Sequence, residues 1–161
     1  MNLKQNSSVF CRKYSTPVQL SIHGSCVKLS LSNAPVNALS VECLKSLNHA
    51  LANLPKSANC LILSSSFPKV FSAGLDIHYL LKRPTEDAHH LEIRLKEYMG
   101  LFQESVERLL SLKIPTAAVI SGACPAGGTV LSLCCDYRVA STDQKFLMGF
   151  TEVRMTLELN F

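Results

Sequence analysis

A run of 22 residues without a charged side chain, residues 114–135, constrains the fold more than any other part of the sequence. The run is long enough for a membrane-spanning helix. It also contains two prolines and three glycines, and the backbone groups of a turn built from them would find no partners in hydrocarbon. We therefore predict no membrane span, and instead a buried strand over residues 116–120, a glycine-rich turn and a short helix over residues 126–134.

Strand and helix signals alternate along the rest of the sequence. Residues 26–32 alternate apolar and polar side chains, which predicts a half-buried strand. Ser40 is a suitable N-cap for the next helix, and the apolar run at residues 59–64 predicts a second buried strand. Apolar residues recur at helical spacing over residues 86–112, which predicts a long amphipathic helix closed by Pro115. This alternation indicates the α/β class.

Length and cysteine content limit the class of protein further. A chain of 161 residues, 47% of them hydrophobic, can bury one sizeable core. Its seven cysteines are odd in number, scattered and without a C-x-x-C pair, so neither a disulfide framework nor a zinc site is indicated. We expect a single domain whose thiols stay reduced in an intracellular compartment.

The net charge of +4 comes from the first part of the chain. Before Glu42 the only charged residues are Lys4, Arg12, Lys13 and Lys28, and the rest of the sequence carries twelve charges of each sign. A nucleic-acid-binding surface needs basic residues clustered on the folded part, with aromatic residues among them. No such cluster is present in the sequence, so we predict no nucleic-acid partner.

The first seventeen residues differ in composition from the rest of the chain. Residues 1–17 are basic, rich in serine and free of acidic residues, which is typical of a mitochondrial transit peptide. They lack the long apolar segment of a secretory signal. We predict a transit peptide at residues 1–17, with a frayed basic tail as the alternative, and a folded domain at residues 18–161.

Two glycine turns, at residues 71–77 and 122–128, are the main candidates for chemistry. Each comes after a predicted strand and before a predicted helix. The first N–H groups of a helix lack internal acceptors, so two such turns facing each other can hold an anionic oxygen. The alternative is that these glycines serve only tight packing. Neither turn matches a dinucleotide-binding, P-loop or nucleophile-elbow motif.

No metal site is predicted from the sequence. His89 and His90 stand among charged residues near the start of the long helix, where we expect solvated side chains rather than ligands. Ser121 has no partner base at a recognisable spacing, which disfavours a hydrolase.

The residues of the two turns resemble a known family. Phe-Ser-Ala-Gly-Leu-Asp at 71–76 is followed by Ser-Gly-Ala-Cys-Pro-Ala-Gly-Gly at 121–128 and Cys-Asp-Tyr-Arg-Val-Ala at 135–140. With Asn-Ala-Pro-Val-Asn-Ala-Leu at 33–39, these motifs resemble the crotonase, or enoyl-CoA hydratase/isomerase, superfamily, and within it the mitochondrial Δ3,Δ2-enoyl-CoA isomerases. The resemblance covers residues 18–152. It implies a crotonase-like ββα spiral core, an acyl-CoA thioester as substrate, a homotrimer and a place in the mitochondrial matrix.

The resemblance also implies roles for individual residues. In this family two backbone N–H groups hold the thioester carbonyl, and the matching residues are Leu75 and Gly127. Asp76 is expected to brace the first turn and cap the next helix rather than touch the reacting carbon. Contacts with substrate or coenzyme A are implied for Ala73, Gly74, Leu75, Asp76, Ile77, Gly127 and Thr151.

The number of carboxylates distinguishes the reactions of the family. Its hydratases resemble one another in having two glutamates, and the first of these positions holds Val130 in this sequence. The second holds Glu152, with Thr151 in place of the usual Asn; without the resemblance, Glu152 would be interpreted as a surface charge. One carboxylate suits an isomerase, because a single base can take a proton from the α-carbon and return it to the γ-carbon. No metal or redox cofactor is implied, since the substrate carries its own coenzyme A.

After Glu152 the sequence departs from the family. Isomerases of this kind continue with a long helical region that closes the acyl pocket and makes much of the trimer interface, whereas here only residues 153–161 remain. We therefore expect a partial crotonase-like domain without the C-terminal helical region. Two hypotheses stay open: an isomerase that converts 3-enoyl-CoA to trans-2-enoyl-CoA in fatty acid β-oxidation, or a non-catalytic fragment that binds acyl-CoA or associates with full-length subunits. A hydratase is a third and weaker hypothesis.

Overall fold

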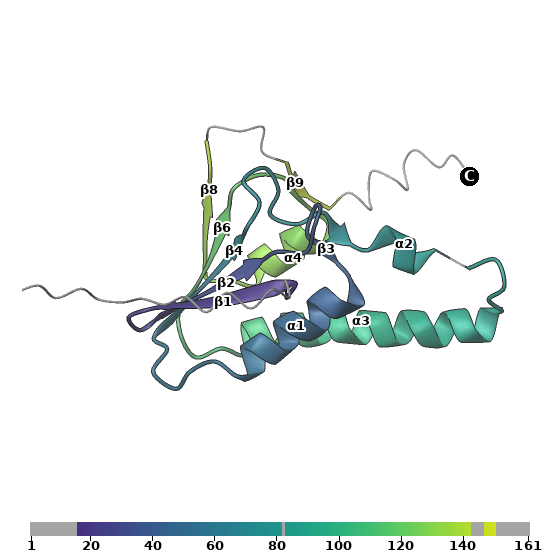
Figure 1. The fold of residues 1–161 in the computed structure, drawn as a ribbon, viewed down its shortest axis with the longest axis horizontal. Coiled ribbons are helices and arrows are strands. Elements are labelled where there is room, and N and C mark those ends of the chain that lie inside the picture. The colour runs from purple at the N-terminus through teal and green to yellow at the C-terminus, as the bar shows by residue number, and fades with distance from the viewer. Residues whose placement is uncertain (1–15, 82, 143–146, 151–161) are drawn as a thin grey trace, which may run out of the picture.

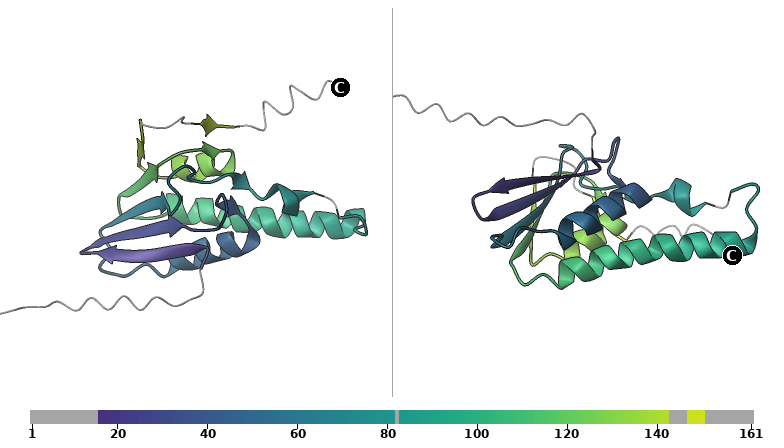
Figure 2. Two further views of the ribbon diagram at one scale, coloured as in Figure 1. Left: turned by 45° about the horizontal axis from the view of Figure 1, so that its top comes forward. Right: turned by 60° about the horizontal axis from the view of Figure 1, so that its bottom comes forward.

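The structure, a computed structural model, describes residues 16–81, 83–142 and 147–150. A five-stranded sheet forms one layer, and helices α1 and α3 lie side by side against one of its faces (Figure 1 and Figure 2). The predicted transit peptide falls almost entirely outside the described residues. The predicted α/β class is confirmed.

Strand order in the main sheet is β1-β2-β4-β6-β8. Strands β1 (Val18–His23) and β2 (Cys26–Leu31) form an antiparallel hairpin. Strands β4 (Cys60–Ser65), β6 (Thr116–Ile120) and β8 (Tyr137–Ala140) add to it in parallel. The structure confirms the strands predicted near residues 26–32, 59–64 and 116–120; β1 and β8 were not predicted.

The helices begin and end close to the predicted limits. Helix α1 (Val41–Ala52) is capped by Ser40, whose hydroxyl accepts from the Cys43 N–H at 3.2 Å. Helix α3 (Ala88–Leu110) starts and stops two residues inside the predicted range, with Asp87 as its N-cap. The 22 uncharged residues hold β6, the second turn and helix α4 (Gly127–Leu133). No helix among the described residues is long and apolar enough to cross a membrane.

The core lies between the sheet and the helices. Alternate residues of β2, namely Val27, Leu29 and Leu31, point to the helix side and are almost fully buried, while the residues between them are half-buried. Leu44 and Leu47 of α1 are fully buried in the same core. Burying each such side chain contributes about 1.5–3 kcal/mol. Turning β2 over would expose all three, so the alternation in the sequence decides which face of the sheet meets the helices.

Within the described part of the chain, four two-residue strands lie outside the main sheet and bring distant segments together. Strand β3 (Ala38–Leu39) pairs in parallel with β5 (Gly74–Leu75), and β7 (Cys124–Pro125) pairs in parallel with β9 (Met148–Gly149). Such short strands carry no periodicity that a sequence could show.

The two glycine turns are hydrogen-bonded directly to each other. The Ala123 N–H donates to the Lys69 carbonyl at 3.1 Å, and the Phe71 N–H donates to the Ala123 carbonyl at 2.8 Å. Gly122 permits this approach, because a Cβ atom placed on it would lie 2.1 Å from the Lys69 carbonyl oxygen. The turn segments therefore pack backbone against backbone, and only glycine fits at residue 122.

We predict that Gly122→Ala destabilises the protein by about 3 kcal/mol or more, because the new methyl group overlaps backbone that cannot move without breaking this pairing. Gly100 in α3 is the matched control. A Cβ atom there meets nothing within 4 Å, so Gly100→Ala should stabilise the helix by about 0.5–1 kcal/mol. Urea unfolding of both variants measures the difference. Equal stabilities for the two variants would contradict the close packing.

Candidate functional site

The two predicted turns meet at Gly74 and Gly127. Gly74 has a φ of +87°, and a Cβ atom on it would lie 3.2 Å from the Gly127 nitrogen. A Cβ atom on Gly127 would lie 3.3 Å from the Leu75 nitrogen. Each glycine thus leaves open the space beside an amide of the opposite turn. The amides of Leu75 and Gly127, which the family resemblance indicated, therefore lie close together in the structure.

The amides on either side of Leu75 are already engaged. The Gly74 N–H donates to Ser72 Oγ at 3.1 Å, and the Asp76 N–H donates to Tyr98 Oη at 2.8 Å. Gly127 is the first residue of α4, where N–H groups lack acceptors within the helix, and its N-cap Ala126 makes no side-chain capping bond. The Gly127 amide at the start of α4 and the Leu75 amide beside it can together hold a carbonyl oxygen as it gains negative charge.

Asn37 supports the first turn through its side chain and its backbone. The side chain is fully buried, donates to the Phe71 carbonyl at 2.9 Å and accepts from the Asn33 N–H at 2.8 Å. The Asn37 carbonyl in turn accepts from Ser72 Oγ at 2.8 Å. A φ of +52° at this residue is a conformation that Asn tolerates better than most side chains. The segment at residues 33–39, noted in the sequence only as part of the family resemblance, therefore holds the first turn in place.

Tyr98 in α3 joins β3 to the first turn. Its hydroxyl donates to the Leu39 carbonyl at 2.6 Å and accepts from the Asp76 N–H, and the side chain is fully buried. Burial raises the pKa of Tyr98 to about 12, so the hydroxyl stays protonated at neutral pH. Tyr98 was not among the predicted site residues. The signal that could have revealed it is a tyrosine one turn from Phe102 on the buried face of a helix, because a buried hydroxyl needs a partner.

Asp76 caps the helix after the first turn, as predicted. Its carboxylate accepts from the N–H groups of His78 at 3.0 Å and Tyr79 at 3.3 Å, at the start of α2 (Ile77–Leu80). The carboxylate is therefore engaged with the local backbone, which agrees with a bracing role rather than a chemical one.

An ion pair fixes the far end of α2. Arg94 of α3 donates to both carboxylate oxygens of Glu86 at 2.7 Å and to the carbonyl groups of Tyr79 and Leu81. The hydrogen bonds from Arg94 lower the pKa of Glu86 to about 2. The turn, α2 and α3 are thus joined by charge-assisted hydrogen bonds as well as by Tyr98.

The residues predicted to contact substrate differ in exposure. Ala73 and Ile77 are exposed, Leu75 and Asp76 are half-buried, and Gly74 is buried. Exposed side chains on either side of the half-buried Leu75 suit a loop that receives a ligand from solvent. Gly127 is buried as well. The predicted contact Thr151 and the catalytic candidate Glu152 lie outside the described residues.

Strand β9 lies against the second turn immediately before those two residues. The Cys124 N–H donates to the Leu147 carbonyl at 2.7 Å, and the Ala126 N–H donates to the Gly149 carbonyl at 2.8 Å. The Gly149 N–H donates to Thr129 Oγ1 at 2.9 Å. These hydrogen bonds tie residues 147–149 to the same turn that presents Gly127.

The apolar residues around the second turn differ in how far they are buried. Val130 and Met148 are half-buried and pack against the core, whereas Phe150 is 55% exposed. Val130 lies in α4. It is the position that the family resemblance matches to the first glutamate of the hydratases, and here it carries an aliphatic side chain.

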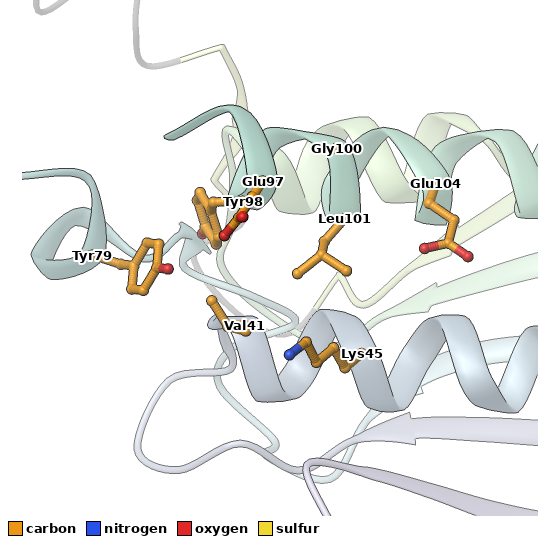
Figure 3. Close-up of a pocket in the computed structure, with 8 residues that line it drawn as sticks. All are labelled: Val41, Lys45, Tyr79, Glu97, Tyr98, Gly100, Leu101 and Glu104. Carbon is orange, nitrogen blue, oxygen red and sulfur yellow. The ribbon is translucent and has the colours of Figure 1, made fainter. Parts of the chain in front are cut away.

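A pocket of about 460 Å³ lies between α1 and α3, beside the first turn (Figure 3). Tyr79 and Tyr98 stand at one end of it and Glu104 at the other. Tyr98 connects the pocket to the turn, because its hydroxyl accepts from the Asp76 N–H.

The histidines near the start of α3 behave as solvated residues. The exposed His90 ring lies 2.7 Å from the Asp87 carboxylate, which also caps the helix. No cluster suited to a metal ion occurs among the described residues.

Comparison with known proteins identifies the family. Residues 21–156 match the enoyl-CoA hydratase/isomerase family. The chain belongs to this family. The resemblance to the crotonase superfamily is thereby confirmed, and with it the crotonase-like fold.

Individual relatives include both isomerases and hydratases. The chain is 40% identical over 126 residues to the mouse mitochondrial enoyl-CoA delta isomerase 1, covering 77% of this chain and 41% of the relative. It is 32% identical over 123 residues to the mouse mitochondrial methylglutaconyl-CoA hydratase, covering 75% of this chain and 36% of the relative. The human mitochondrial delta3-delta2-enoyl-CoA isomerase structure superposes with a TM-score of 0.79 at 31% identity, covering 87% of this chain and 53% of that one. The chain thus spans about two fifths of the length of these curated relatives.

We predict that Tyr98→Phe destabilises the protein by about 1–3 kcal/mol, because the Leu39 carbonyl and the Asp76 N–H lose a shared partner. Tyr79→Phe is the matched control. The Tyr79 ring lies 4.9 Å from that of Tyr98, and within the described part of the chain its hydroxyl makes no hydrogen bond that holds the turn. Urea unfolding should separate the two variants. An equal loss in both would show that the Tyr98 hydroxyl does not support the turn.

Proposed function

We propose that this protein is an enoyl-CoA isomerase that converts 3-enoyl-CoA to trans-2-enoyl-CoA in fatty acid β-oxidation. The observation that carries the proposal is the meeting of the Leu75 and Gly127 amides, in a chain of this family that is 40% identical to an enoyl-CoA delta isomerase. Such a donor pair suits a thioester carbonyl.

The two amides would act on the substrate oxygen. Hydrogen bonds from Leu75 and Gly127 withdraw electron density from the thioester carbonyl, which makes the α-carbon proton easier to remove. The dienolate that results carries its charge mainly on that oxygen. Removal of one donor from a site of this kind typically raises the barrier by about 3–4 kcal/mol, so the pair would supply a large share of the catalysis.

Glu152 is the proposed base. It comes two residues after Phe150, and two residues of extended chain span at most about 7 Å. The hydrogen bonds of β9 to the second turn would therefore keep this carboxylate within reach of a thioester held at Gly127. Glu152 would take a proton from the α-carbon and return it to the γ-carbon, which needs no second carboxylate. Val130 at the other hydratase position favours isomerisation over hydration.

The remaining predicted contacts would complete the substrate site. Ala73 and Ile77, which are exposed, would receive the coenzyme A moiety beside Leu75, and Thr151 would lie next to the base. No further cofactor is proposed, because proton transfer and carbonyl polarisation need only these groups and the thioester itself.

The proposed location is the mitochondrial matrix. The acid-free, basic composition of residues 1–17 supports it, and so does the similarity to isomerases that are named as mitochondrial.

A second candidate function is binding without turnover. The described residues hold the two amides that would bind a thioester, and binding alone needs no base. Such a protein would bind acyl-CoA or associate with full-length subunits.

We predict that the purified chain isomerises a 3-enoyl-CoA and that Glu152→Gln lowers the rate by about 10²–10⁴-fold, because the amide cannot carry the proton. Glu158→Gln, a second glutamate near the same end of the sequence, is the matched control and should leave the rate unchanged. The formation of trans-2-enoyl-CoA is followed by its absorbance.

The outcomes separate the two candidates. Equal rates for Glu152→Gln and wild type would remove Glu152 from the mechanism. Saturable binding of acyl-CoA by a folded wild-type chain without turnover would support the binding function in place of catalysis.

A further inference from the structure

Two cysteines from distant parts of the sequence lie side by side in the main sheet. Cys26 is the first residue of β2 and Cys60 is the first residue of β4, and the parallel register pairs them directly. The Asn59 N–H donates to the Ser25 carbonyl at 2.8 Å, which holds the strands together one residue earlier. Directly paired residues point to the same face of a sheet, so the two thiols are neighbours.

Both thiols can be reached from solvent. Both side chains are half-buried. The Cys26 thiol donates to the Val27 carbonyl at 4.0 Å. The neighbouring Cys60 side chain holds the pKa of Cys26 above its ordinary value. The register therefore places the two thiols side by side on one face of the sheet in the reduced protein.

The other described cysteines are less suited to reaction. Cys43, Cys124 and Cys135 are buried, and burial raises the pKa of Cys43 to about 12 and those of Cys124 and Cys135 to about 11. Burial also shields these three sulfur atoms from an oxidant in solution, so they are protected in a way that the half-buried Cys26 and Cys60 are not. Cys134 is half-buried like the pair, which makes it a suitable control.

The backbone spacing suits a disulfide. Neighbouring strands lie about 4.7–4.9 Å apart, and disulfides join residues whose Cα atoms are about 4.4–6.8 Å apart. The Cβ atoms of a disulfide are about 3.5–4.5 Å apart, slightly less than the strand spacing, so a bond between Cys26 and Cys60 needs side-chain rotation and a small local approach of the two strand ends rather than a change of fold.

We infer that Cys26 and Cys60 form a dithiol site that is oxidised to an intramolecular disulfide by a small-molecule disulfide such as oxidised glutathione. One thiolate attacks glutathione disulfide, forming a mixed disulfide and releasing one glutathione thiolate. The second cysteine, as thiolate, attacks the protein sulfur of that mixed disulfide and releases the second glutathione. The protein loses two protons and two electrons, and the oxidant is reduced to two glutathione thiols.

The dithiol site is separate from the proposed substrate site. Cys26 and Cys60 stand at the amino ends of β2 and β4, whereas the glycine turns come after the carboxyl ends of β4 and β6. In Figure 2 the hairpin of β1 and β2 and helix α2 lie at opposite ends of the molecule. Oxidation would link two strands of the sheet without touching the Leu75 and Gly127 amides.

The test uses the reduced full chain incubated with oxidised glutathione, followed by blocking of free thiols, trypsin digestion and mass spectrometry. Cleavage places Cys26 alone in peptide 14–28 and Cys60 alone in peptide 57–69. We expect these two peptides to be joined, with the loss of two hydrogens, as the main cross-linked product. Cys60→Ser should instead leave Cys26 as a glutathione adduct, and Cys134→Ser should leave the cross-link unchanged.

Thermal unfolding gives a second measurement. Oxidation should raise the unfolding temperature of the wild type, because the cross-link restricts the unfolded chain, and should not raise that of Cys60→Ser. Separate glutathione adducts on Cys26 and Cys60, a main cross-link to another cysteine, or complete blocking of both thiols after incubation would overturn the inference.

Discussion

The backbone hydrogen bonds between residues 69–71 and Ala123 are the constraint on which the candidate site depends. They set two turns from distant parts of the chain against each other with no side chain between them, which Gly122 makes possible. The proximity of the Leu75 and Gly127 amides is a consequence of that contact, since each lies beside the glycine of the opposite turn. The main sheet holds the strands that lead into the turns and so fixes their separation.

Buried polar side chains stabilise the arrangement of the turns that these backbone hydrogen bonds set. Asn37 bonds to the first turn from one side and Tyr98 from another, and both are fully buried. A buried polar group that loses its partner is destabilising by about 1–3 kcal/mol, so such residues specify one arrangement of the turn. The Gly74 N–H donates to Ser72 and the Asp76 N–H donates to Tyr98. The Leu75 amide between them is the one proposed to bind a ligand.

The strands and helices in which apolar residues recur at regular spacing could be predicted from the sequence. The strands near residues 26–32 and 116–120 and the helix capped by Ser40 result from local alternation and capping, which depend on nearby residues. The pairing of β3 with β5 and the roles of Asn37 and Tyr98 could not be predicted in this way, because they arise only when distant segments meet. The two amides were identified through the family resemblance, and the structure supplies their proximity. Glu152 stays a prediction.

Joint binding of the thioester oxygen by Leu75 and Gly127 is tested most directly by an amide NMR titration of the ¹⁵N-labelled chain with a saturated acyl-CoA. If both amides bind the oxygen, the Leu75 and Gly127 N–H resonances shift together. They should move further than those of Gly74 and Asp76, whose N–H groups already have acceptors. Binding of the thioester with the Leu75 and Gly127 resonances unmoved would contradict this role for the two amides.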